Sequence, residues 1–230
     1  MLSLIVRVPL LLLIFDLACS SQDFLALVRT WLPSAVGDRW AYEEEILGGD
    51  RANPEVERWE QEDVTVAVET IPEGVLIRRK VSYRNNTAPP QRVRGNGESN
   101  ILVAGGCVYY LEGYWGARFD DFRKELTIGI ALPDVCFPLR AGKTWGHPDW
   151  KEGRGRDLWT VGGFGKKKPD DPASVRADSW RLEAHLSSGE DNDVWFEPGT
   201  GVVAKRAFHN GTYGDWQVRL VSFEPGRSAR

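Results

Sequence analysis

The sequence predicts an all-β fold of mainly antiparallel strands, arranged as a barrel, half-barrel or sandwich, with one short N-terminal helix. Several segments alternate apolar and polar residues with a period of two, which is typical of strands that bury one face. Turn signals rich in glycine and proline separate these segments, and no long amphipathic helix pattern interrupts them. A chain of 230 residues with 42% hydrophobic and 27% charged residues can bury a sizeable core.

The first twenty residues have the features of an export signal. Arg7 precedes an apolar run at residues 8–15, and small residues follow at positions 18–21. Asp16 ends the apolar run too early for a membrane-spanning helix. We therefore expect residues 1–20 to be a signal peptide and residues 23–230 to form a single β-rich domain in the periplasm or outer envelope of a bacterium.

Cys19 occupies the place that a bacterial lipoprotein signal gives to its lipidated cysteine, within the sequence Leu-Ala-Cys-Ser. Such signals usually carry leucine three residues before the cysteine, where this chain has Asp16. Two outcomes stay open, namely lipidation of Cys19 and ordinary cleavage near residues 18–21. Contact with the membrane is expected only through such an N-terminal lipid anchor.

The predicted elements begin with a short helix at residues 23–30, and strands follow from there to the end of the chain. Alternation is clearest at residues 178–186, where Trp180 and Leu182 share a face and charged residues lie opposite. Residues 125–132 show the same period, with Leu126 and its alternate neighbours on one face. About nine to eleven strands are expected in total. The other predicted strands are residues 64–68, 74–83, 193–196, 202–208 and 215–223.

A phrase of proline, three residues, glycine, two residues and tryptophan occurs twice. It comprises Pro33, Gly37 and Trp40 in the first copy, and Pro138, Gly142 and Trp145 in the second. Proline suits a strand entrance, glycine permits a tight reversal, and tryptophan suits the rim of a β-core. The phrase is interpreted as a structural device, while an internal duplication and a chance match stay as alternatives.

Two cysteines follow the predicted leader. In an exported chain, Cys107 and Cys136 predict a disulfide, with two buried free thiols as the alternative. Closing a loop of this size would add roughly 3–4 kcal/mol of stability in the chain-entropy model. No Cys-x-x-Cys pattern or nearby histidine pair supplies further ligands, so no metal site is expected.

Charge and motif content argue against several functional classes. A net charge of −4 disfavours a nucleic-acid partner, which needs a basic surface. The sequence has no lipase-type Gly-x-Ser-x-Gly, no zinc-protease His-Glu-x-x-His and no phosphate loop, so neither catalytic residues nor cofactors are predicted. A divergent hydrolase stays as an alternative, for which His147 with Asp149 or Asp157 would be the pair to examine.

The chain is rich in aromatic residues, with ten tryptophans. One hypothesis is an apolar cavity that holds an acyl chain or a lipid. A second is a carbohydrate-binding module with an exposed aromatic platform, and the third is ordinary packing of the core and its rim. The candidate ligand-binding residues are Tyr109, Tyr114, Trp115, Phe119 and Trp145.

Two segments resemble parts of uncharacterised exported bacterial proteins, many of them lipoproteins. The segments are "FPLRAGKTW", which contains the second copy of the repeated phrase, and "WFEPGTGVVAKRAF", whose Trp195 precedes Pro-Gly-x-Gly-Val. The resemblance covers about 50 residues, and it implies a β-rich, barrel-like periplasmic fold without an established activity. Together with the leader, it favours a non-enzymatic cell-envelope protein that binds an apolar ligand or another envelope protein.

Overall fold

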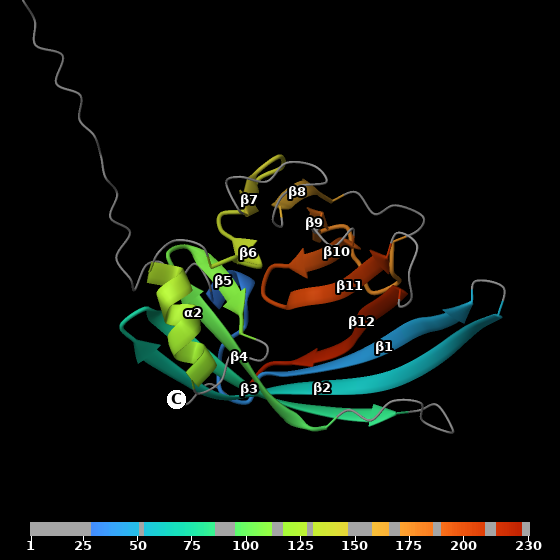
Figure 1. Ribbon diagram of the computed structural model, residues 1–230, viewed down its shortest axis with the longest axis horizontal. Helices are drawn as coiled ribbons and strands as arrows, with labels where there is room; N and C mark the ends of the chain where they lie inside the picture. The colour runs from blue at the N-terminus through green and yellow to red at the C-terminus, as the bar shows by residue number, and fades with distance from the viewer. Residues whose placement is uncertain are drawn as a thin grey trace, which may run out of the picture.

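The computed structural model describes residues 29–50, 53–85, 95–111, 117–127, 131–146, 158–165, 171–185, 190–209 and 215–226. Within these ranges the chain forms twelve strands and the helix α2 (Ala117–Thr127). All twelve strands belong to one sheet that curls into a nearly closed barrel (Figure 1). The predicted all-β, antiparallel class is therefore confirmed, and the barrel is the form it takes.

The sheet consists of two consecutive meanders of six strands each. The strands of the first are β1 (Arg39–Asp50), β2 (Asn53–Ile71), β3 (Gly74–Asn85), β4 (Gly97–Ala104), β5 (Cys107–Tyr110) and β6 (Val135–Cys136). Those of the second are β7 (Thr144–Gly146), β8 (Leu158–Phe164), β9 (Trp180–His185), β10 (Glu190–Glu197), β11 (Gly201–His209) and β12 (Asp215–Glu224). Antiparallel pairing of β1 with β12 joins the two meanders.

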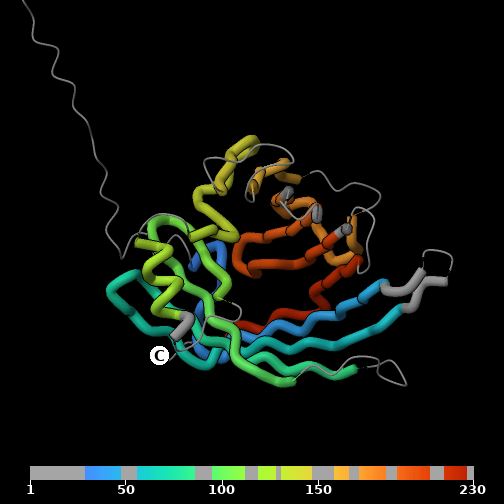
Figure 2. Tube along the Cα trace, in the orientation of Figure 1, coloured from blue at the N-terminus to red at the C-terminus, as the bar shows by residue number. Residues whose placement is uncertain are grey.

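The two ends of the sheet lie close together in the chain. The sheet order runs from β6 through β1 and β12 to β7, so β6 and β7 are its edges. Residues 137–143 alone connect these two strands, and the trace in Figure 2 follows this segment from one edge to the other. The chain itself therefore spans the seam, where the edge strands β6 and β7 do not pair with each other.

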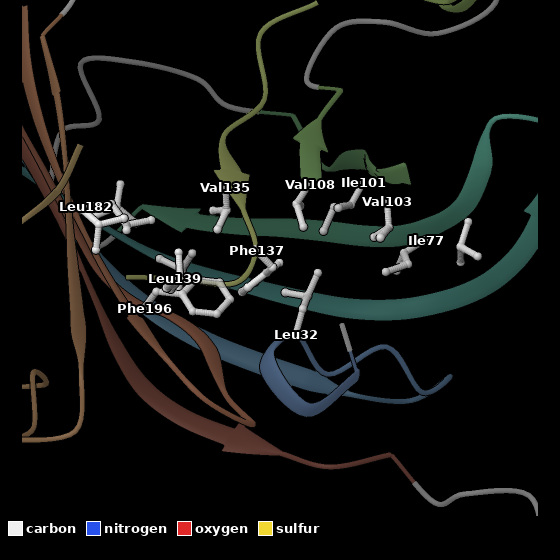
Figure 3. Close-up of a cluster of buried hydrophobic side chains, with 14 residues drawn as sticks. Leu32, Ile77, Ile101, Val103, Val108, Val135, Phe137, Leu139, Leu182 and Phe196 are labelled. Carbon is white, nitrogen blue, oxygen red and sulfur yellow. The ribbon is translucent and has the colours of Figure 1, made fainter. Parts of the chain in front are cut away.

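Apolar side chains fill one part of the barrel interior (Figure 3). They come from both meanders and from the segment that precedes β1, because alternate residues of each strand point inward. Leu182 and Ile101 are fully buried in this cluster, and Phe137 contacts Phe196 with ring centroids 5.8 Å apart. Its buried members are Leu32, Val75, Ile77, Ile101, Val103, Val108, Val135, Phe137, Leu139, Val161, Leu182, Val194, Phe196 and Val202.

Helix α2 covers part of the outer face of the first meander (Figure 1). Phe119, Phe122 and Leu126 recur at helical spacing and pack against a cluster that contains Tyr109 and Leu111. The prediction of a strand at residues 125–132 is wrong, because this helical spacing prevails as far as Thr127. Residues 131 and 132 lie outside any strand, and residues 128–130 lie outside the described ranges.

Most other predicted strands are confirmed. The segments at residues 64–68, 74–83, 193–196, 202–208 and 215–223 lie within β2, β3, β10, β11 and β12. The segment at 178–186 is represented by β9, at residues 180–185. Of the predicted helix at residues 23–30, only residues 29 and 30 are described, and both are helical.

The two copies of the repeated phrase form the same turn at the start of each meander. Both glycines have positive φ angles, 92° at Gly37 and 78° at Gly142, which glycine adopts without steric cost. The first copy bonds Gly37 N to Thr65 O (2.8 Å), Thr65 N to Asp38 O (2.9 Å) and Asp38 N to Ala35 O (3.0 Å). The second bonds Gly142 N to Val161 O (2.8 Å), Val161 N to Lys143 O (2.9 Å) and Lys143 N to Arg140 O (2.9 Å). The phrase therefore builds one hydrogen-bonded device twice.

Cys107 and Cys136 form a disulfide between β5 and the edge strand β6. The two cysteines are direct partners in the antiparallel register, and their Cα atoms are 4.1 Å apart. Since β6 has only two residues, the covalent bond fixes a strand that few hydrogen bonds hold. It also anchors the beginning of the segment that spans the seam.

Candidate functional site

A cavity of about 720 Å³ lies on the inner face of the barrel, next to the apolar cluster. Strands β1 to β5 of the first meander line it together with β11 and β12 of the second. Val202 belongs to both the cavity wall and the apolar cluster, and Tyr110 also packs against that cluster. The volume falls within the range of about 300–1,000 Å³ typical of small-molecule sites.

The lining of the cavity is mixed in character. Five of its residues carry charge, and eight are apolar or aromatic. The charged residues are Glu44, Asp63, Arg79, Glu98 and Lys205, and the apolar and aromatic ones include Ile46, Val81, Val202, Trp216 and Val218. A lining of this kind suits a ligand that has both an apolar and a polar part.

Strand β3 shows how the sequence produces the transition from the apolar core to the mixed lining of the cavity. Its inward-pointing residues follow a period of two, and the first two of them, Val75 and Ile77, belong to the apolar cluster. The next three inward positions, Arg79, Val81 and Tyr83, line the cavity. The boundary between core and cavity therefore falls at Arg79.

Arg79 is held against Trp40 inside the barrel. Only 4% of Arg79 is exposed, and its guanidinium carbon lies 3.8 Å from the centroid of the Trp40 ring, in a cation–π contact. The indole N–H of Trp40 donates to the carbonyl oxygen of Thr200 (2.8 Å), which fixes the ring. The tryptophan of the first repeated phrase thus orients a buried charge at the cavity wall.

The buried Tyr42 and the half-buried Tyr110 lie beside this charge. The hydroxyl of Tyr42 donates to the carbonyl oxygen of Val202 (3.2 Å), and Lys205 Nζ lies 5.1 Å from the centroid of the Tyr110 ring. Burial raises the pKa of Tyr42 well above its ordinary value, and the nearby Asp63 carboxylate adds to the effect, while Arg79 opposes it. Burial likewise raises the pKa of the Tyr110 hydroxyl. Both tyrosines are therefore neutral at physiological pH.

Stability is expected to fall above about pH 10 partly because of Tyr42. The folded state keeps its proton at a pH where the unfolded chain releases it, so this contribution is complete below about pH 10 and declines above it. We expect Tyr42→Phe to lower the free energy of unfolding by about 1 kcal/mol at pH 7, because the hydrogen bond to Val202 is lost. When the pH is raised above about 10, the free energy of unfolding of this variant should fall less than that of the wild type. Urea unfolding at a series of pH values measures both effects. Parallel pH profiles of the two proteins would contradict the burial of this hydroxyl.

The structure separates the ligand-binding residues predicted from sequence. Tyr109 and Phe119 pack at the outer cluster under α2, so they do not line the 720 Å³ cavity. Trp145 stacks on Trp159 with ring centroids 6.3 Å apart, beside the apolar cluster. Ligand binding by these side chains stays a prediction. Tyr114, Trp115 and the lipidation candidate Cys19 lie outside the described residues.

Some of the residues on which the alternative functions depend lie outside the described part of the chain. His147, Asp149 and Asp157, which would form a hydrolase pair, all lie outside it. Within it, no three His, Cys, Asp or Glu side chains are grouped so that they could hold a metal ion. Among its aromatic side chains, Phe164 is the one that is exposed, at 49%. No helix in the described ranges is long and apolar enough to cross a membrane.

Sequence reasoning did not identify the residues that line the cavity. Tyr42, Arg79 and Lys205 were not predicted as site residues, although one signal for Arg79 is present in the sequence. In the segment "GVLIRRKVSY", Arg79 is the charged member of an inward row that is otherwise Val75, Ile77, Val81 and Tyr83. A charge within an apolar row of a strand points to a buried functional group or ion pair.

No family model and no curated protein matches the sequence. Among solved structures, a proposed exported protein with a YmcC-like fold from Bacteroides fragilis is 9% identical, with 85% of this chain and 99% of that chain covered and a TM-score of 0.42. A proposed lipoprotein from Parabacteroides distasonis is 11% identical over 85% of this chain and 99% of its own, with a TM-score of 0.40. A proposed outer membrane lipoprotein-sorting domain from Vibrio parahaemolyticus is 11% identical over 91% and 92%, with a TM-score of 0.27. With scores this low, none of them bears on what the cavity binds.

Proposed function

We propose that the protein is a non-enzymatic, exported cell-envelope protein that binds an amphipathic ligand, such as a lipid or a molecule with an acyl chain, inside its barrel. The observation that carries the proposal is the cavity of about 720 Å³, whose wall combines buried charges with apolar side chains. A wholly apolar ligand would leave Arg79 and its neighbours desolvated without compensation, whereas an amphipathic ligand can satisfy both kinds of surface.

The site also has room for the apolar part of such a ligand. A second cavity of about 140 Å³ adjoins the first, because the two share the lining residues Tyr110, Val202, Lys205 and Trp216. It extends the cavity towards β10, where Val194 belongs to the apolar cluster. A flexible chain can follow such an extension, with its polar end left among the charged residues.

Two features support an envelope location. Residues 1–20 carry the pattern of an export signal, and disulfides such as Cys107–Cys136 form and persist in oxidising compartments. A carbohydrate-binding platform has less support, because such a surface needs several exposed aromatic rings. Among the described aromatic side chains, only Phe164 is exposed.

Filling the cavity should weaken ligand binding. Val218 lines the cavity, so we expect Val218→Trp to weaken binding of the uncharged probe N-phenyl-1-naphthylamine by about tenfold or more, since the new ring occupies the space the probe needs. Val221 lies on the same strand with 58% of its surface exposed, and Val221→Trp is the matched control. Probe fluorescence measures binding, and displacement by a long-chain fatty acid or a lysophospholipid tests the class of ligand.

The same titration can contradict the proposal. Equal binding by the wild type and by Val218→Trp would place the probe elsewhere, and no binding of the probe or of either lipid to the wild type would reject a cavity-binding function. If Val218→Trp does not fold by circular dichroism, Val81→Phe fills the same cavity from β3.

A further inference from the structure

Two N–H groups of the Arg79 guanidinium have no hydrogen-bond acceptor among the described residues, and Arg79 lines the cavity. Among the described residues, its Nε and Nη2 atoms have no hydrogen-bond partner, although both are buried and only 4% of the residue is exposed. These two N–H groups point in parallel along one side of the planar guanidinium. Two buried donors of a guanidinium without acceptors are costly to the protein.

The surroundings of Arg79 leave this edge as the point of recognition. Trp40 covers one face of the guanidinium at 3.8 Å. The nearby Asp63 carboxylate accepts a hydrogen bond from the side chain of Gln61 (2.8 Å), and the Tyr42 hydroxyl is bonded to Val202. The edge formed by Nε and Nη2 is left without a protein acceptor among the described residues, on a side chain that lines the cavity.

The other charges of the cavity make recognition specific rather than general. Glu44, Asp63 and Glu98 line the same cavity as Arg79 and Lys205, so the site is not a basic pocket that attracts any anion. An oxyanion binds favourably in this cavity only if it forms directed hydrogen bonds to a cation, because the carboxylates repel it elsewhere. Two parallel N–H groups match the two oxygens of a carboxylate or of a phosphate ester in a bidentate pair.

We propose that the ligand of this cavity is an anionic amphiphile whose carboxylate or phosphate oxygens bind Arg79 through Nε and Nη2, with Lys205 as the second cation. This inference rests on the proposed function, and it defines the polar part of the ligand that the barrel holds. The apolar part would then lie along Val81, Val202 and Val218.

The test compares three ligands that share a twelve-carbon chain: dodecanoate, dodecanol and dodecyl phosphate. They are titrated by calorimetry, the two anions below their micelle concentrations and the alcohol below its solubility limit. The full wild-type chain should bind dodecanoate or dodecyl phosphate roughly 10- to 100-fold more tightly than dodecanol, as expected for hydrogen bonds to a charged group. The tighter of the two anions identifies the head group. In Arg79→Met this preference should fall below about threefold, while dodecanol affinity is retained.

Two variants make the result interpretable. Arg84→Met removes a guanidinium from the same strand, where Arg84 is 72% exposed and pairs with Glu60, and it should leave the preference unchanged. Arg79→Lys keeps the positive charge without the planar pair of donors, so it should lose most of the preference even if Arg79→Met does not fold.

Different results would overturn the anion site at Arg79 and the binding of a ligand in the cavity. If the wild type binds the alcohol and both anions equally, or if Arg79→Lys retains the full preference, the anion site is overturned while cavity binding stands. If none of the three ligands binds and the uncharged naphthylamine probe does not bind either, the proposed function itself is overturned.

Discussion

Replacing Phe196 with alanine is expected to lower the free energy of unfolding by about 3–5 kcal/mol. Phe196 is 1% exposed and belongs to the apolar cluster, where its ring contacts Phe137 at 5.8 Å and Trp31 at 6.5 Å between centroids. Phe137 belongs to the seam segment, Trp31 to the chain before β1 and Phe196 itself to the second meander, so these rings hold together three distant parts of the sequence. Its loss leaves a cavity that these separate elements cannot refill by a local shift.

Urea unfolding followed by circular dichroism measures this loss, and Phe164→Ala is the matched control. Phe164 contacts Trp180 at 4.8 Å but is 49% exposed, so its removal should cost about 1 kcal/mol or less. Equal effects of the two substitutions would contradict the position of the apolar cluster inside the barrel.

Removing the Cys107–Cys136 disulfide is expected to lower the free energy of unfolding by about 3–4 kcal/mol. The two cysteines are 29 positions apart, and without the bond the unfolded chain regains the entropy that closing this loop removes. The effect should be concentrated at the seam, because β6 is a two-residue edge strand that leads into Phe137 and Leu139 of the apolar cluster. For a chain of this size, a loss of this order lowers the melting temperature by roughly 6–16 °C. The double variant Cys107→Ser/Cys136→Ser, compared with the oxidised wild type in a thermal melt, provides the measurement.

Reduction supplies an independent comparison for the same bond. Wild-type protein treated with a reductant should melt close to the double variant, and peptides carrying Cys107 and Cys136 should react with iodoacetamide only after that treatment. A melting temperature that reduction leaves unchanged would mean that the disulfide does not stabilise the seam.

Much of the barrel could be predicted because strand alternation is a local property. Trp180, Leu182 and Ala184 face inward in β9 as their spacing indicates, and the same holds for the inward residues of β12. The error at residues 125–132 has a physical cause in Leu126, which fits both an alternating row and a helical row with Phe119 and Phe122. Packing against the outer cluster favours the helical row, and that contact is not visible in the local sequence.

The cavity could not be predicted in the same way, since its wall combines strands from both ends of the chain. Arg79 on β3 and Lys205 on β11 line one space only because β1 pairs with β12. A shift of one residue decides the role of an aromatic side chain in this setting. Tyr110 lines the cavity, whereas its neighbour Tyr109 points to the outer cluster under α2.

The repeated phrase shows how one structural device can acquire two roles. Its two copies share their turn hydrogen bonds, and in both the indole N–H donates to a backbone carbonyl, of Thr200 for Trp40 and of Pro133 for Trp145. Trp40 carries a buried arginine on its ring, whereas Trp145 stacks on Trp159. The equivalence of the turns accords with an internal duplication, which stays a hypothesis.

The most direct test of the account is native mass spectrometry of the full chain, purified from its own cell envelope without added lipid and followed by solvent extraction. We expect one bound molecule per polypeptide, with an apolar tail and a carboxylate or phosphate group. This molecule should be lost from the Arg79→Lys variant. A ligand-free wild-type chain, or a bound molecule without an anionic group, would contradict the account.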